Sequence, residues 1–172
     1  TGVNGKRAMI LDLASTDPDG WENDTNPNAG MTYNDAVIYE LHVRDLSSDE
    51  SSGIQNTGKF LGLTETGTTT ASGIPTGLDH MKDLGITHVH LLPIYDYASV
   101  DETQSDKPQF NWGYDPENYN VPEGSYSTDP YNGAVRVAEM KQMVKVLHDN
   151  QISVIMDVVY NHVYNASDFC VN

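Results

Sequence analysis

The sequence of 172 residues has few cysteines and few positively charged side chains. Cys170 is its only cysteine, which excludes a disulfide within the chain and a zinc site built from cysteines. Lysine and arginine number 9 against 25 aspartates and glutamates, so the formal net charge is -16. Phosphate backbones and anionic lipid surfaces repel such a chain. We therefore expect no nucleic acid partner and no membrane partner, and a neutral polysaccharide suits the charge better.

Long apolar runs are also missing, because none approaches the roughly 18 residues that would indicate a membrane span. The chain starts at Thr1 without a leader sequence and stops at Asn172 without a stop signal, so we expect neither end to be natural. It is also shorter than the roughly 250 residues that a closed (β/α)₈ barrel usually takes. We expect an incomplete globular object, from a parent protein that is either secreted or cytoplasmic.

Three apolar runs have the length of β-strands, at residues 36–43, 86–94 and 152–159. Helical spacing of apolar residues precedes the second and the third run. The two helical stripes are Leu78, Met81 and Leu84, and Val137, Met140, Val144 and Leu147. Strands alternating with helices favour a parallel α/β sheet, either a barrel or a doubly wound sheet.

The connections differ in length, because turns from helix to strand are short while the segments from strand to helix, 45–73 and 95–132, are long. Long segments of this kind place function at the carboxyl ends of the strands. At the other end of the sequence, residues 1–21 contain one alternating apolar run, Ala8 to Leu13, which predicts a strand. Residues 22–34 are rich in Asn, Asp, Gly and Pro and predict a linker.

Aromatic residues are concentrated in the segment 95–132, which holds eight of the fifteen in the chain. They are Tyr95, Tyr97, Phe110, Trp112, Tyr114, Tyr119, Tyr126 and Tyr131. One interpretation is a small satellite core beneath a long loop. The other is a sugar-binding platform, because the apolar face of a pyranose stacks on flat rings while polar neighbours bind its hydroxyls. Trp112, Tyr114 and Asp115 fit the second interpretation best.

The run Phe110-Asn111-Trp112-Gly113-Tyr114-Asp115-Pro116 strongly resembles the signature of type I pullulanases, members of glycoside hydrolase family 13, with Phe110 where the family has Tyr. Three further segments resemble the same family: Tyr39–Ser47, Val121–Ser127 and Asp157–His162. The resemblance implies an incomplete (β/α)₈ TIM barrel over residues 35–172, with about the first three strands and two helices. It also implies that residues 1–21 end a β-sandwich module of starch-binding type.

The resemblance also implies roles for individual residues. Tyr114 is expected to stack on the sugar whose bond is cut, with Asp115 assisting that subsite, and Asn161 and His162 are expected to bind sugar. A plainer alternative for His162 is a loop histidine that caps a backbone carbonyl. Asp157 lies in an apolar run and needs a partner, because burying an unpaired carboxylate is costly. In the family it orients an arginine on the fourth strand.

Metal sites are weakly supported by the sequence. Asn161 resembles an asparagine that binds calcium in related α-amylases, but no cage of carboxylates accompanies it, so we expect no required cofactor and keep calcium as a less favoured alternative. His88 and His90 alternate on one strand face without a third ligand at a persuasive spacing, which favours a structural role.

The family's nucleophile and acid/base follow the fourth and fifth strands, which lie beyond Asn172. We therefore expect a parent enzyme that hydrolyses α-1,6-glucosidic linkages in pullulan, amylopectin and limit dextrins, and a chain that is inactive alone and needs the rest of the barrel to fold. Isoamylase, branching enzyme and a non-catalytic glucan-binding module are the alternatives. A metal-dependent hydrolase using Asp157, His162 and the strand histidines is another.

Overall fold

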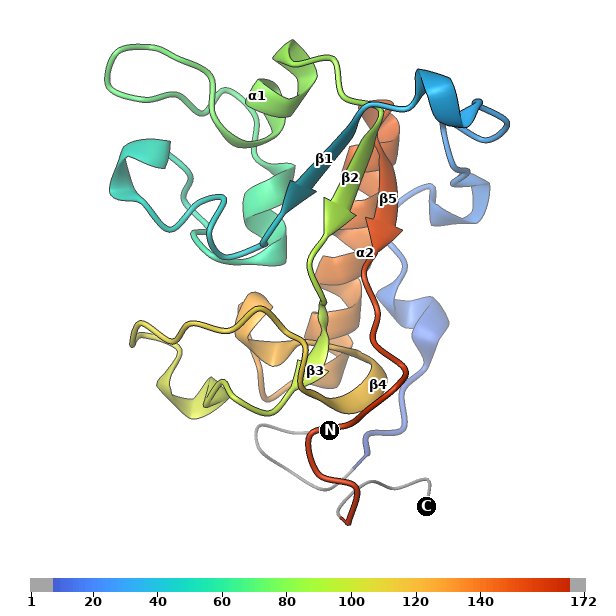
Figure 1. Cartoon of the computed structure of the whole chain (residues 1–172), viewed down its shortest axis with the longest axis vertical. Helices are drawn as coiled ribbons and strands as arrows, with labels where there is room; N and C mark the ends of the chain where they lie inside the picture. Colours follow the sequence, from blue (N-terminus) through green and yellow to red (C-terminus); the bar gives the residue numbers. More distant parts are fainter. Residues whose placement is uncertain (1–7, 168–172) are drawn as a thin grey trace.

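The protein is represented by a computed structural model that describes residues 8–167; Cys170 and Asn172 lie outside the described residues. Its centre is a parallel three-stranded sheet in the order β1-β2-β5. The strands are β1 (Ile38–Leu41), β2 (His88–Leu91) and β5 (Ser153–Met156), and all point the same way in Figure 1. The three predicted strands are therefore confirmed, each shorter than its apolar run because the ends of the runs continue into loops.

Two α-helices connect these strands, α1 (Gly77–Asp83) between β1 and β2 and α2 (Gly133–Asp149) before β5. Figure 1 shows α2 running behind the sheet, where Met143 and Leu147 are fully buried in the same core as Val89 and Leu91 of β2. Apolar strands covered by a helix in this way are what a parallel sheet requires. Among residues 8–167, every helix is too short or too polar to cross a membrane.

The face that α2 buries differs from the predicted stripe. The buried side chains are Arg136, Glu139, Met143 and Leu147, whereas Met140 and Val144 are only partly buried against the core. The prediction is correct for Leu147, but in the first part of α2 it lies about one residue away from the buried side chains, because that part packs against polar groups of the segment 95–132. Apolar periodicity cannot detect a face that buries an arginine and a glutamate.

A second, smaller sheet follows β2 along the chain. It pairs β3 (Tyr95–Tyr97) with β4 (Pro116–Pro122) in antiparallel orientation, with irregular register. Short 3-10 helices occupy the connections: η1 (Leu13–Thr16), η2 (Trp21–Asn23), η3 (Tyr33–Asp35), η4 (Glu50–Ser52), η5 (Phe60–Thr64), η6 (Glu102–Gln104) and η7 (Gly124–Tyr126). The long segments 45–73 and 95–132 leave the carboxyl ends of β1 and β2, as the sequence predicts.

The predicted strand at Ala8 to Leu13 is wrong. Residues 8–12 have no regular structure, and the chain then turns into η1, where the Asp12 carboxylate accepts a hydrogen bond from the Ala14 amide at 3.1 Å. An alternating run becomes a strand only where another strand satisfies its backbone groups. In the described part of the chain this run instead lies against the start of α2, where the Gly133 amide is 3.2 Å from the Met9 sulfur.

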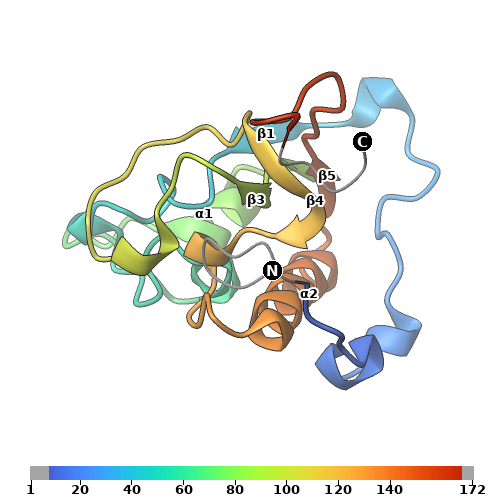
Figure 2. The ribbon, with the colours of Figure 1, turned by 90° about the horizontal axis from the view of Figure 1, so that it is seen from below.

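The N-terminal segment is fastened to the outside of α2, as Figure 2 shows. The Lys141 ammonium donates to the Leu13 carbonyl at 2.9 Å and to Asp17 at 2.5 Å, and it lies 5.7 Å from the centre of the Trp21 ring. Near the other end of the helix, His148 Nδ1 lies 2.7 Å from an Asp24 carboxylate oxygen. Residues 13–24 therefore run along the outer surface of α2.

Within the predicted linker, Asn28 anchors the chain to the amino ends of the strands. Its side-chain nitrogen donates to the carbonyl of Thr87, just before β2, at 2.8 Å and lies 2.9 Å from the Ser153 hydroxyl at the start of β5. The Ser153 hydroxyl in turn donates to the side chain of Asn26. The segment 22–34 thus includes specific contacts as well as turns.

The central sheet has two open edges in the described part of the chain, because β1 and β5 each pair only with β2. Exposed edges carry unpaired amides and carbonyls that template aggregation. We therefore predict that an isolated polypeptide of residues 1–172 aggregates or folds only partly. Size-exclusion chromatography and thermal unfolding check this, and a soluble monomer with a cooperative transition would contradict it.

Candidate functional site

Loops from the carboxyl ends of all three parallel strands converge on one cluster. His42, just after β1, contacts Asn111, while Tyr114 contacts Asp157, just after β5. The segment that carries Asn111 and Tyr114 belongs to the long connection after β2 (Figure 1). Most of the residues singled out from the sequence therefore lie together, although 43 positions separate Tyr114 from Asp157.

Internal hydrogen bonds fix the loop of residues 110–116. The Nδ2 atom of Asn111 donates to the Asp115 carboxylate at 2.9 Å, while the Asn111 side-chain oxygen accepts from the Gly113 amide at 2.5 Å. Gly113 has a φ of +87°, and a Cβ atom there would lie 2.7 Å from the Pro93 carbonyl oxygen. Glycine is needed at this position both for its positive φ and for the close approach of the backbone to Pro93, just after β2.

His42 connects this loop to β1. Its Nδ1 accepts the Asp45 amide at 3.3 Å, which leaves Nε2 as the ring nitrogen that carries a hydrogen. That Nε2–H donates to the Asn111 carbonyl at 2.6 Å and lies 3.1 Å from the Tyr126 hydroxyl. Sequence reasoning missed His42, although its place at the end of a strand in the Tyr39–Ser47 match was a usable signal.

Four of the eight aromatic side chains of the segment 95–132 form two contrasting pairs. Tyr97 and Tyr126 are buried and their rings pack edge to face at 6.1 Å, and both belong to the main hydrophobic core rather than to the separate satellite core of the first interpretation. Phe110 and Trp112 are 72% and 59% exposed, with ring centres 6.1 Å apart. Such exposed flat rings form a surface on which a sugar can stack.

Tyr114 and Asp157 form the central contact of the cluster. The Tyr114 hydroxyl donates to the Asp157 carboxylate at 2.5 Å, and this hydrogen bond, followed by burial, raises the pKa of Tyr114 to about 12. His90 Nε2 lies 3.8 Å from the same carboxylate oxygen. The partner that the sequence demanded for Asp157 is therefore present within the chain as a tyrosine.

His162 lies over the same loop. Its Nε2 is 2.7 Å from the Tyr114 carbonyl and its Nδ1 is 3.0 Å from the Asn161 side-chain oxygen. The Tyr119 hydroxyl donates to the His162 carbonyl at 2.9 Å. In this arrangement the histidine caps a carbonyl, as the plainer alternative predicts, while its ring and Asn161 both remain exposed at the surface.

Asp115 organises the loops around it. One carboxylate oxygen accepts the Ser99 amide at 2.9 Å and the other accepts from Asn111 at 2.9 Å. Its carbonyl accepts the Ala98 amide at 3.2 Å. The side chain thus connects the residues after β3 to the loop that carries Trp112.

The strand histidines do not form a metal cluster with the other candidates. His88 Nδ1 lies 2.7 Å from the Thr87 hydroxyl. His88 pairs with Ser153 at the amino end of the sheet, whereas Asp157 follows the carboxyl end of β5. Over residues 8–167, the group of three potential ligands that lie close together is Asp96, Glu102 and Glu123. The cluster therefore offers no support for metal-dependent hydrolysis at Asp157 and His162.

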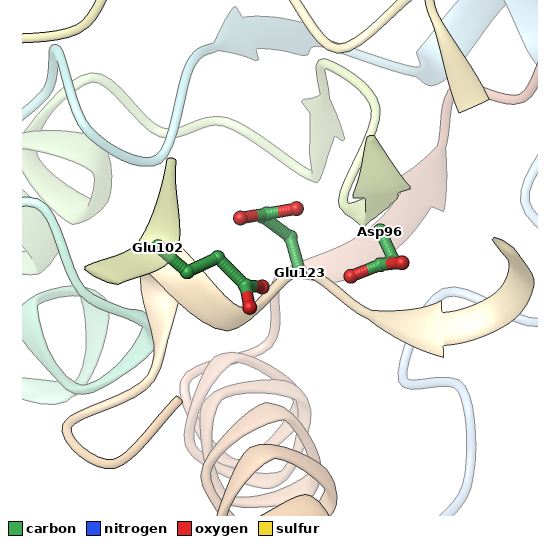
Figure 3. Close-up of side chains that lie close together, drawn as sticks. All are labelled: Asp96, Glu102 and Glu123. Atoms are coloured by element: carbon green, nitrogen blue, oxygen red, sulfur yellow. The ribbon is translucent and has the colours of Figure 1, made fainter. Parts of the chain in front are cut away.

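That buried carboxylate group was not anticipated from the sequence (Figure 3). Arg136 of α2, 1% exposed, donates to Asp96 at 3.2 Å and to Glu102 at 2.6 Å, and its Nε donates to the Pro130 carbonyl at 2.8 Å. The guanidinium therefore occupies the position between two of the three carboxylates that a metal ion would take. The fit to a metal is poor, because a metal would have to displace these bonds.

Glu123 carries the remaining carboxylate of the group. Its oxygens accept the Tyr97 amide at 3.1 Å and the Ser125 amide at 2.8 Å. Burial, with the charge of Glu102 second, raises the pKa of Glu123 to about 8. Burial also raises the pKa of Glu102, against the opposing effect of Arg136. A largely neutral Glu123 at pH 7 reduces the excess of negative charge around one arginine.

Comparison with known proteins defines the class. The family model described as "Alpha amylase, catalytic domain" matches residues 16–170. The chain belongs to this family, and its parallel sheet with α1 and α2 is part of the family's TIM barrel.

Several pullulanases are similar to the chain. The chain is 47% identical over 168 residues to the pullulanase of Bacillus subtilis (strain 168), covering 96% of this chain and 22% of the relative. A pullulanase structure from Paenibacillus barengoltzii, complexed with maltohexaose and alpha-cyclodextrin, is 62% identical with a TM-score of 0.94, over 98% of this chain and 26% of that one. The pullulanase from Bacillus acidopullulyticus is 50% identical with a TM-score of 0.85, over 95% and 20%. The chain thus spans about a quarter or less of these relatives.

The raised pKa of Glu123 predicts a pH dependence of stability. A neutral Glu123 favours the folded state below the ordinary carboxyl pKa, and this contribution is lost as the pH rises through about 8. The limiting slope is about 1.4 kcal/mol per pH unit. Thermal unfolding of the full-length protein between pH 5 and pH 9 is expected to show this decline.

Glu123→Gln is expected to flatten the decline. The variant is also less stable at pH 5 by about 1–2 kcal/mol, because an amide nitrogen cannot accept one of the two backbone hydrogen bonds. Glu50→Gln, at an exposed glutamate, is the matched control and keeps the wild-type slope. Equal slopes in wild type and Glu123→Gln would contradict the assignment.

Proposed function

We propose that this chain forms part of the glucan-binding cleft of a starch-debranching glycosidase. The full-length enzyme hydrolyses α-1,6-glucosidic linkages in pullulan, amylopectin and limit dextrins. The observation that carries the proposal is the contact between Tyr114 and Asp157, which joins the loop of residues 110–116 to the end of β5 beside His162. The maltooligosaccharide bound to the Paenibacillus barengoltzii pullulanase supports a glucan substrate.

Each member of the cluster receives a role in this proposal. The exposed face of Trp112 and the ring of Tyr114 stack on the sugar. Asn161 and His162, on the loop after β5, bind the sugar hydroxyls. Asp157 acts by holding the Tyr114 hydroxyl, and Asp115 acts by holding the loop. No cofactor is required, and calcium at Asn161 is the less favoured alternative.

We assign no catalytic carboxylate within residues 8–167. A retaining glycosidase needs two carboxyl groups about 5 Å apart on either side of the scissile bond. Asp96, Glu102 and Glu123 are close together, but all three are buried, and Arg136 binds two of them. The chain alone is therefore inactive, and the reacting groups come from other parts of the enzyme.

Isoamylase and branching enzyme are less favoured because the loop of residues 110–116 carries the pullulanase-type run Asn-Trp-Gly-Tyr-Asp-Pro. A self-contained glucan-binding module would need a sheet without open edges. We also propose that residues 1–21 are the end of a preceding β-sandwich module and that residues 22–34 link this module to the barrel. The docking of residues 13–24 along α2 supports a fixed junction there.

The substrate assignment is tested with the full-length enzyme on two polysaccharides. Release of reducing ends is expected from pullulan, which contains α-1,6 linkages, and not from linear amylose. Retained anomeric configuration is expected by proton NMR of the initial product. Cleavage of amylose with pullulan left intact would rule out debranching.

The role of Trp112 is tested by substitution. Trp112→Ala is expected to raise the KM for pullulan about tenfold, because loss of one stacking ring costs about 1–1.5 kcal/mol. Tyr131→Ala is the matched control, since Tyr131 is also 59% exposed but lies just before α2. Steady-state kinetics with both variants decides the matter, and identical KM values would remove Trp112 from the cleft.

A further inference from the structure

A small polar pocket lies on the side of the molecule where the segments after β1 and β2 meet. Its volume is about 180 Å³. Two of the chain's nine lysines and arginines, Arg44 and Lys59, line it together with several hydroxyl-bearing residues. The hydroxyl-bearing residues are Ser48, Thr57, Ser105, Ser125 and Tyr126. Two positive charges side by side at one pocket contrast with the formal net charge of -16 for the whole chain.

Existing hydrogen bonds hold both cations in place without using all their donors. Arg44 donates to the carbonyls of Gln109 and, at 3.4 Å, Lys107. Lys59 donates to the Ser125 carbonyl at 2.8 Å. A guanidinium has five N–H donors and an ammonium has three, so each retains donors for a ligand.

The charged groups around Lys59 only partly balance it. Burial lowers the pKa of Lys59 and the nearby Arg44 lowers it further, whereas Glu139 and Glu123 raise it. Glu139 already accepts hydrogen bonds from Thr128, and Glu123 has a raised pKa. Two half-buried cations that face one pocket leave room for a negatively charged ligand.

We propose that this pocket binds a small tetrahedral oxyanion of the phosphate class, either free or as a monoester. Two cations and several hydroxyls are the donor set that such an anion prefers. A neutral sugar fits poorly, because the one ring that lines the pocket belongs to Tyr126, which is 2% exposed and presents no stacking face. The pocket is distinct from the cluster around Tyr114 and Asp157.

The same arginine connects the pocket to the aromatic loop. Arg44 holds the carbonyls of Lys107 and Gln109, and Gln109 directly precedes Phe110 of the loop that carries Trp112. An anion bound to Arg44 therefore lies next to the stem of the loop that presents the exposed rings. The proposal does not depend on debranching activity, because anion binding is measured directly.

The test is a titration of the full-length protein with inorganic phosphate at constant ionic strength, followed by calorimetry or phosphorus NMR. Saturable binding is expected, and Lys59→Met is expected to weaken it at least tenfold. Lys82→Met is the matched control, because Lys82 is an exposed lysine of α1 that pairs with Asp79, and it keeps wild-type affinity. Glucose 6-phosphate, with glucose as its control, distinguishes a monoester from free phosphate.

Two results would overturn the proposal: no saturable phosphate binding by the wild type, or equal affinity in Lys59→Met and Lys82→Met. Circular dichroism establishes that each variant is folded. If Lys59→Met does not fold, Thr57→Val takes its place, because it removes a hydroxyl from an exposed position without changing charge. A severalfold loss of phosphate affinity is then expected, and unchanged affinity counts against the pocket.

Discussion

The burial of one guanidinium among carboxylates holds together the least regular part of the molecule. Arg136 binds Asp96 of β3 and Glu102 of η6, and it also donates to the carbonyls of Pro122 and Pro130 at the two ends of the loop that leads into α2. Because β3 and β4 are short and irregularly paired, these bonds supply much of the shape of the segment 95–132. Removing either partner alone would leave a buried charge uncompensated.

The central sheet was predictable because its signals are local. Each of the three strands lies within a short apolar run, and pairing in parallel follows from the helices between them. Ala8 to Leu13 shows the limit of this reasoning, since alternation describes one strand's faces and says nothing about a neighbour that would pair with it. The buried face of α2 was mispredicted for a related reason, because Arg136 and Glu139 become buried only through partners distant in sequence.

The residue types of the candidate site were predictable, but most of their contacts were not. The motif identified Tyr114, Asp157 and His162, and the structure places them together. That Tyr114 is the partner of Asp157, and that Ser99 is a partner of Asp115, depends on how loops from different strands fold over one another. Such contacts join positions far apart in the chain, and neither periodicity nor spacing encodes them.

The asparagine contacts at the amino ends of the strands separate two functions of the fold in space. Asn28 joins Thr87 to Ser153, at the end of the strands opposite to the loops that carry Trp112 and His162. Strand alignment is thus secured at the amino ends of the strands, away from the loops of the candidate site. The loops at the carboxyl ends of the strands are therefore free to vary in length and composition without disturbing the registration of the strands, which is the property that lets one barrel scaffold carry different functional sites.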